Sequence, residues 1–321
     1  METLKHILEN KKCLKLICGA GNENIKEIEK LVYVYAMAGF NFFDICAKKD
    51  VLIAAENGLK RADSQANICV SIGLQNDVHV SKAVINNQKC INCNICLSVC
   101  PQNAIYIEDN KYNVDEKKCI GCFKCLDVCQ NSAIIAEHKY KAPYTMLLPL
   151  ISEKLDCVEF HCTSDKTEEI IDNWYKIKSI YNGLLSICLD RSKLGDDYII
   201  YMLKEMLKKS EPYSVILQVD GKPMSGGENN YNSTLQTVAF AKLINDAKLP
   251  VYILLSGGTN SLSTKLAKEC EVNVNGVAIG SYARKIVKDY IQYDNFFEND
   301  LLKKKAIAVA KELAQDLLKY L

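Results

Sequence analysis

The sequence predicts an α/β fold, a TIM-like (β/α)8 barrel with a smaller cysteine-rich module inserted after the third strand. Eight short apolar runs of strand-like composition alternate with amphipathic segments of helical periodicity. Eight cysteines crowd the stretch between the third run and the fourth. The length agrees, because removing about 75 inserted residues from a chain of 321 leaves roughly the 250 residues of a typical barrel.

The apolar runs are the predicted strands, and a helix is predicted after each except the third. The predicted strands are Lys15–Gly19, Phe42–Cys46, Asn67–Ile72, Cys157–His161, Leu184–Asp190, Ser214–Val219, Val251–Leu255 and Gly276–Ile279. The predicted helices are Ile25–Ala38, Asp50–Arg61, Lys166–Tyr181, Asp196–Lys209, Thr234–Ala247, Leu262–Glu269 and Ala283–Tyr290. A last helical segment, Leu301–Leu321, is expected to pack outside the barrel.

This order of elements predicts four segments. Residues 1–75 form the first part of the barrel with strands one to three, and residues 76–145 form the inserted module. Residues 146–295 form the second part with strands four to eight, and residues 296–321 form a C-terminal helix.

A Rossmann domain is the competing architecture. Gly19-Ala20-Gly21 follows the first predicted strand and Asp44 lies in the second, which is the topology of a dinucleotide fingerprint. Asn24 stands where the third glycine of that fingerprint is expected, so the barrel is preferred.

Two cysteine runs indicate iron–sulfur chemistry. Each cysteine of a C-x2-C-x2-C-x3-C run has a counterpart 29 positions later, which indicates an internal duplication. Pro101 follows the first run and Gln130 follows the second. In two-cluster ferredoxins the fourth cysteine of each run binds the other cluster. The expected ligands of two [4Fe-4S] clusters are Cys90, Cys93, Cys96 and Cys129 for one, and Cys119, Cys122, Cys125 and Cys100 for the other.

A pair of zinc sites is the alternative, since C-x2-C pairs also bind zinc. Zinc sites usually draw on two separated pairs, whereas the three-plus-one pattern occurs here twice, so a ferredoxin-like module with two clusters is preferred.

Composition excludes several classes of partner. The formal net charge is +1, so no global field attracts nucleic acid or an anionic membrane. No apolar stretch approaches the ~18 residues of a membrane span, and the first residues lack the features of a secretory signal. We expect a cytoplasmic protein in which most of the other eight cysteines are small buried apolar residues.

Polar residues recur at the C-terminal ends of the predicted strands, where barrel enzymes place their active sites. They are Asp44, Glu159, His161, Asp190, Arg191, Gln218 and Asp220. A single polar residue at such a position is expected anyway, because the chain leaves the core where a strand ends. Taken together, these residues predict a functional cavity with Glu159 and His161 near its mouth. No catalytic residue is assigned.

Two glycine-containing turns predict a phosphate site. Gly257-Gly258 follows the seventh predicted strand, and Gly280-Ser281 ends the eighth and opens a helix. Backbone N–H groups and a helix N-terminus face an anion at this place in the fold. Flavin mononucleotide (FMN) is the first candidate ligand and a phosphorylated metabolite is another. The alternative is that the glycines only make tight turns.

Four motifs occur together in this chain. They are Lys15-Leu-Ile-Cys-Gly-Ala20, the two cysteine runs, Asp220-Gly-Lys-Pro-Met-Ser-Gly226 and Leu255-Ser-Gly-Gly-Thr-Asn260. The glycine-rich loop 220–227 is a lid, a ligand clamp or a plain connection. In this combination of motifs the chain resembles the LdpA family of light-dependent-period iron–sulfur proteins. The resemblance covers most of the length of the chain. The resemblance implies a redox-active protein that feeds cellular redox state into circadian timing, and it implies no substrate for the barrel.

We therefore expect an iron–sulfur redox protein that accepts or passes electrons, senses or relays cellular redox state, and docks a redox partner protein near the module. The alternative is an oxidoreductase, dependent on flavin or another phosphate-bearing ligand, in which the clusters wire electrons to the strand ends. A purely structural use of the clusters is the third possibility.

Overall fold

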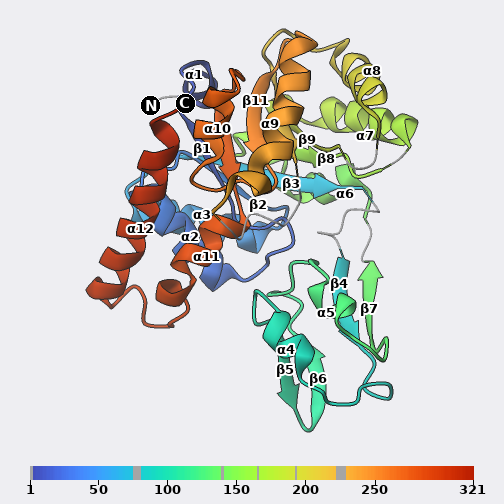
Figure 1. Ribbon diagram of the computed structural model, residues 1–321, viewed down its shortest axis with the longest axis vertical. Coiled ribbons are helices and arrows are strands. Elements are labelled where there is room, and N and C mark those ends of the chain that lie inside the picture. Colours follow the sequence, from blue (N-terminus) through green and yellow to red (C-terminus); the bar gives the residue numbers. More distant parts are fainter. Residues whose placement is uncertain (1–2, 75–80, 139–140, 165, 192–193, 222–228) are drawn as a thin grey trace.

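The computed structural model describes residues 3–74, 81–138, 141–164, 166–191, 194–221 and 229–321. Eight parallel strands form a closed barrel in the order β1-β12-β11-β10-β9-β8-β3-β2 (Figure 1). The strands are β1 (Cys13–Ile17), β2 (Phe42–Cys46), β3 (Asn67–Gly73), β8 (Cys157–His161), β9 (Leu184–Asp190), β10 (Val215–Asp220), β11 (Tyr252–Ser256) and β12 (Gly276–Ile279). The predicted barrel is confirmed, and the Rossmann alternative is wrong because the sheet closes on itself.

Side chains of the strands alternate between two environments, as the pleat of a strand requires. On β8, Val158 and Phe160 join the apolar core between the strands and the helices. Cys157 belongs instead to a second apolar cluster inside the barrel, and the polar Glu159 and His161 share its face of the strand. The barrel interior is therefore apolar at one end and polar at the other.

Helices surround the barrel on its outside. They are α2 (Ile25–Met37), α3 (Lys49–Arg61), α7 (Thr167–Ile180), α8 (Asp196–Leu207), α9 (Tyr231–Asp246), α10 (Ser263–Glu269), α11 (Ser281–Ile291) and α12 (Asp300–Leu318). The last of them packs on α2, α10 and α11, outside the barrel as expected. Within the described ranges, no helix combines the length and the apolar character needed to cross a membrane.

A short N-terminal helix, α1 (Leu4–Glu9), was not predicted from the sequence. Its Leu4, Ile7 and Leu8 are buried against the inward-facing side chains at the N-terminal end of the strands, among them Phe42 and Ile216. Thr3 caps the helix by accepting a hydrogen bond from the backbone N–H of His6. This helix closes the barrel at the end opposite to its polar interior.

The inserted module lies below the barrel in Figure 1, on the side away from the two chain termini. It holds two antiparallel pairs, β4 (Ser81–Ile85) with β7 (Ile134–His138) and β5 (Ile105–Glu108) with β6 (Lys111–Val114). Two short helices, α4 (Ile95–Val99) and α5 (Lys124–Asp127), lie within the cysteine runs and contain Cys96 and Cys125. The helix α6 (Pro143–Leu147) and a 3-10 turn (Leu148–Leu150) lead from the module back to β8.

The backbone of the module repeats along with its cysteines. Asn94 and Phe123, 29 residues apart, both have left-handed φ angles, of 65° and 54°. Asn103 and Ser132, with φ of 48° each, form a second such pair. Non-glycine residues rarely adopt this conformation, so its recurrence at the same spacing shows two copies of one local structure.

Candidate functional site

Two cavities in the module are each lined by four cysteines. One is lined by Cys90, Cys93, Cys96 and Cys129, and the other by Cys100, Cys119, Cys122 and Cys125. Each cavity thus combines three cysteines of one run with the fourth cysteine of the other run. Four thiolates around one space are the donor set that a [4Fe-4S] cluster requires, so the residues fit that cofactor.

Backbone N–H groups in the module point at cysteine sulfurs. The Ala104 N–H donates to Cys100 Sγ at 3.3 Å, and the Ala133 N–H donates to Cys129 Sγ at the same distance. The Ala83 N–H donates to Cys119 Sγ at 3.5 Å. Hydrogen bonds to the sulfurs stabilise the reduced state of a cluster and so tune its potential.

The module contacts the barrel through one buried lysine and several smaller contacts. Lys82 Nζ donates to the carbonyls of Gly21 and Cys119 at 2.7 Å each, and so ties the loop after β1 to the second cysteine run. On α11, Lys288 Nζ donates to the Pro101 carbonyl at 2.7 Å. The Glu23 N–H donates to the Lys117 carbonyl at 2.8 Å. The cavity that holds Cys119 therefore belongs to the side of the module that faces the barrel.

A pocket opens at the C-terminal ends of the barrel strands. It holds about 650 Å³ of space, including its opening to solvent. Its lining consists of Ile17, Gly19, Ala20, Asp44, Ile120, Glu159, His161, Cys188, Gln218, Asp220, Ser256, Gly257, Gly258, Thr259, Gly280, Ser281 and Arg284. Ile120 comes from the module, next to Cys119, whereas the other lining residues come from the barrel.

The pocket brings together the four residues predicted to bind phosphate. Gly257 and Gly258 have φ angles of 64° and 80°, and a Cβ on Gly257 would lie 1.8 Å from Asp220 Oδ1. Gly280 and Ser281 stand at the N-terminus of α11, whose backbone N–H groups point toward this side of the pocket. A side chain at position 257 would therefore collide with Asp220, so the turn requires glycine there.

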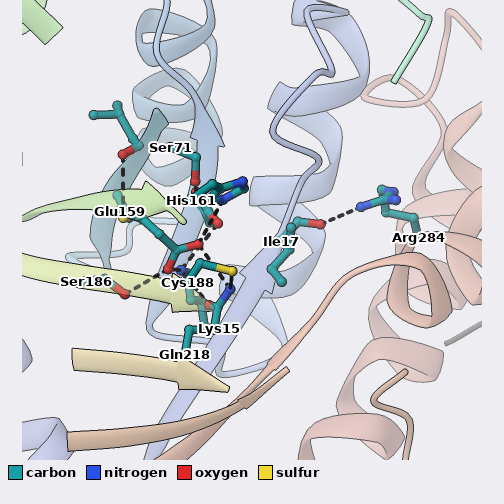
Figure 2. Close-up of polar contacts among 12 residues, drawn as sticks. Lys15, Ile17, Ser71, Glu159, His161, Ser186, Cys188, Gln218 and Arg284 are labelled. Atoms are coloured by element: carbon teal, nitrogen blue, oxygen red, sulfur yellow. Dashed lines mark hydrogen bonds and ion pairs between the residues drawn. The ribbon is translucent and has the colours of Figure 1, made fainter. Parts of the chain in front are cut away.

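Lys15 organises the floor of the pocket (Figure 2). This fully buried lysine donates to Glu159 Oε2 at 2.5 Å and to Gln218 Oε1 at 2.9 Å. It also lies 3.3 Å from Asp44 Oδ2, and Asp44 Oδ1 accepts a hydrogen bond from Ser71. One cation thus meets side chains from three other strands inside the barrel.

The buried carboxyl groups differ in their proton affinity. Burial disfavours the charge of Lys15, but Asp44 and Glu159 raise the pKa of its ammonium well above its usual value. Burial also disfavours the charge of Glu159, but Lys15 holds the pKa of this carboxyl well below its usual range. For Asp44 burial dominates over the attraction of Lys15 and raises the pKa to about 6. Burial, with the charge of Asp190, raises the pKa of Asp220 to about 7.

Sequence reasoning missed two residues of the site and misplaced two. It treated Lys15 only as part of a strand and of a family motif, although a lysine in phase with the inward-facing Cys13 and Ile17 is a signal of a buried polar interior. It gave Ile120 no role. Asp190 and Arg191 were expected at the mouth, but neither is among the residues that line the pocket. The guanidinium of Arg191 pairs with Asp196 at the start of α8. Most of the predicted loop 220–227 lies outside the described residues.

A known protein family matches most of the barrel. The model of the light dependent period A C-terminal domain matches residues 149–318, which is more than half of the chain. The chain belongs to the LdpA family. A 4Fe-4S dicluster domain model matches residues 83–137, so this LdpA-family chain is an iron–sulfur protein, which favours clusters over zinc in the module.

Two known proteins are similar to this chain over different lengths. Light dependent period A from Synechococcus elongatus is 28% identical over 291 residues, covering 84% of this chain and 79% of the relative. Ketoisovalerate oxidoreductase subunit VorD from Pyrococcus furiosus is 36% identical over 59 residues, covering 17% of this chain and 56% of that subunit. The first similarity spans both parts of the LdpA-family chain, and the second is short.

Solved structures similar to this chain share its barrel. The YdjI aldolase from Escherichia coli K12 superposes with a TM-score of 0.52 at 9% identity, over 99% of this chain and 95% of that one. A putative fructose-1,6-biphosphate aldolase from Coccidioides immitis gives a TM-score of 0.50 at 8% identity over the same shares. At such low identity these similarities support the fold alone.

Proposed function

We propose that this protein moves electrons through two [4Fe-4S] clusters between an external redox partner and a phosphate-bearing ligand at the barrel mouth. The proposal rests on the position of Ile120. This residue directly follows the cluster ligand Cys119 and lines the barrel pocket. A cluster held by Cys100, Cys119, Cys122 and Cys125 is therefore separated from a pocket ligand by little more than one side chain. We name it the proximal cluster, and the other the distal cluster.

The phosphate site is supported by the chemistry of one wall of the pocket. Gly257, Gly258 and Gly280 leave their backbone N–H groups approachable, and the N-terminus of α11 adds a favourable dipole. Arg284, one turn into α11, lines the same wall and donates to the Ile17 carbonyl at 2.7 Å. FMN is the first candidate, since it combines a phosphate with a group that accepts electrons from clusters.

The external partner is a protein that docks beside the distal cluster. Cys93 is exposed there, and its neighbours Ile91 and Ile95 are 60% and 38% exposed. An apolar surface next to a cluster edge suits transient contact between redox proteins. The same surface supports the second candidate function, a redox sensor that reports cluster oxidation to a partner without a barrel ligand.

The free thiols of the chain suit a reducing compartment, and we place the protein in the cytoplasm. All sixteen cysteines lie in the described part of the chain, and none of them forms a disulfide. Seven of the eight outside the cysteine runs are buried, while Cys270 is exposed.

Anaerobic binding and reduction of FMN test the proposal. Full-length protein carrying both clusters should bind FMN and reduce it when an electron donor reduces the clusters, as followed by the flavin absorbance. Gly258→Val should abolish flavin binding and keep the iron content. Gly39→Val is the matched control, because Gly39 also has a positive φ, of 98°, but is not among the residues that line the pocket. Cluster-loaded protein that binds neither FMN nor inorganic phosphate leaves only the sensor function.

A further inference from the structure

Three side chains of metal-binding type meet at the floor of the barrel pocket (Figure 2). Glu159 and His161 lie two residues apart on β8, and Cys188 is the register partner of His161 on β9. One ligand atom from each residue lies within 4.8 Å of the others, and all three residues are buried. We propose that Glu159, His161 and Cys188 bind one divalent metal ion of the zinc class, separate from the iron–sulfur clusters.

The spacing of these atoms suits one small ion. A tetrahedral site with bonds of about 2.0–2.3 Å holds its ligand atoms roughly 3.3–3.8 Å apart. Glu159 Oε1 lies 3.3 Å from His161 Nε2, which is within that spacing before any ion is present. The thiol of Cys188 completes the set with a small shift of its side chain.

Neighbouring groups already orient the ligands as a metal site requires. Lys15 and Ser186 both donate to Glu159 Oε2, which leaves Oε1 turned toward His161. Gln218 accepts from Lys15 through Oε1, so its amide NH2 faces the ligands and donates to Glu159 Oε1 at 3.0 Å and to Cys188 Sγ at 3.4 Å. Such outer hydrogen bonds hold ligands in place and stabilise a metal-bound thiolate.

The placement of Cys188 argues for a ligand and against simple packing. Cys13, Cys69 and Cys157 also face the barrel interior, but they sit in the apolar cluster at its closed end. Cys188 lies among a carboxylate, an imidazole and an amide, where a small apolar side chain gains little from burial. A mixed set of carboxylate, imidazole and thiolate favours Zn²⁺ or Fe²⁺ over Mg²⁺.

Three protein ligands leave one coordination position, and it faces the pocket. This is the arrangement of a catalytic metal site, whose open position takes water or a ligand oxygen. The phosphate-binding wall lies in the same pocket, so a ligand anchored by its phosphate presents an oxygen to the ion, which polarises it as a Lewis acid. Zinc is redox-inert, so the proposed metal site does not depend on the proposed electron transfer, and each can be tested without the other.

Zinc K-edge X-ray absorption tests the site without interference from iron. Full-length protein with both clusters reconstituted is desalted and given one equivalent of ZnCl₂ under anaerobic conditions. We expect one bound zinc per chain with one sulfur and two or three nitrogen or oxygen neighbours. A shell of four sulfurs, or no bound zinc after desalting, overturns the proposal.

Matched variants locate the ion. Cys188→Ser and His161→Gln should lose the stoichiometric zinc and keep the iron and sulfide, and Gln218→Leu should weaken zinc binding by about 10–100-fold. Cys162→Ser is the control, because Cys162 is also buried but belongs to the core outside the barrel. Wild-type zinc affinity in Cys188→Ser, measured by chelator competition, also overturns the proposal.

Discussion

The ammonium of Lys15 lies 2.5 Å from Glu159 Oε2, and this contact joins β1 to β8 across the inside of the barrel. The two strands are not neighbours in the sheet, so no backbone hydrogen bond links them. Both residues are fully buried. A charge pair without access to water has a large effect when one partner is removed, because the other charge remains in a medium that solvates it poorly.

Lys15→Met should therefore destabilise the fold by about 3–5 kcal/mol. The double variant Lys15→Met with Glu159→Gln should recover part of that loss, because it removes the stranded carboxylate. Urea unfolding followed by the fluorescence of the single tryptophan, the buried Trp174, measures both. If Lys15→Met were as stable as the wild type, the Lys15–Glu159 pair would contribute nothing to the stability of the fold.

The stability that Asp44 confers should fall as the pH rises. Its pKa is about 6 in the fold, above the usual value of an aspartate, so the folded state holds a proton that the unfolded state has already lost. Asp44→Asn should therefore gain about 1–1.5 kcal/mol relative to the wild type between pH 5 and pH 7.5. Urea unfolding at the two pH values measures the difference. A constant difference, or one of opposite sign, contradicts the raised pKa.

Cys129→Ala should damage the distal cluster and leave the proximal cluster intact. Cys129 lines the cavity of Cys90, Cys93 and Cys96, although it belongs to the other run. Cys100→Ala is the matched variant and should have the reverse effect. Iron and sulfide analysis with electron paramagnetic resonance of the reduced protein distinguishes the two. Loss confined to the cluster of the mutated run would refute the exchange of fourth ligands.

Gly257→Ala should destabilise the protein more than Gly39→Ala. Both glycines have positive φ, where an alanine costs about 1–2 kcal/mol. A Cβ at position 39 meets nothing within 4 Å, whereas one at position 257 collides with Asp220. The difference in unfolding temperature between the two variants measures the cost of the collision. Phosphate or FMN binding should weaken only in Gly257→Ala. Equal shifts in both variants would mean that Asp220 moves aside at no cost.

Lys82→Met should loosen the module without removing the clusters. Lys82 donates to the carbonyl of Gly21 on the barrel and to the carbonyl of Cys119 in the module, and its Nζ lies 3.3 Å from Glu23 Oε1. We expect unchanged iron content, slower flavin reduction and faster proteolysis between module and barrel. Lys111→Met, an exposed lysine at the far hairpin, is the control and should match the wild type. Equal rates in both variants would show that this contact does not position the module.

The barrel was predictable because its outward-facing residues are almost all apolar. The predicted strand Cys157–His161 has the same bounds as β8 in the structure, and its polar residues Glu159 and His161 occupy inward-facing positions. The helix α1 escaped prediction because six residues give too little periodicity. The pair of β4 and β7 escaped because its strands lie far apart in sequence and Ile135 on β7 is more than half exposed.

The candidate site was predictable in its parts and not in its connections. Glycines after the last two strands and cysteines at fixed spacing are local patterns, so the sequence alone indicates them. The contact of Lys15 with Glu159 spans 144 residues, and the approach of Ile120 to the barrel depends on how the module packs. No local pattern encodes either relationship, because both arise from tertiary packing.

The position of the module within the chain sets the kinetic order of any exchange between its clusters and the barrel pocket. Because the module is inserted between β3 and β8, both of its ends are covalently joined to the barrel that it faces. Electron exchange between these two parts is first-order, and diluting the protein leaves its rate unchanged. Exchange between the distal cluster and a separate partner is second-order and slows on dilution. The concentration dependence of each phase after rapid mixing therefore assigns it to one end of the module or the other.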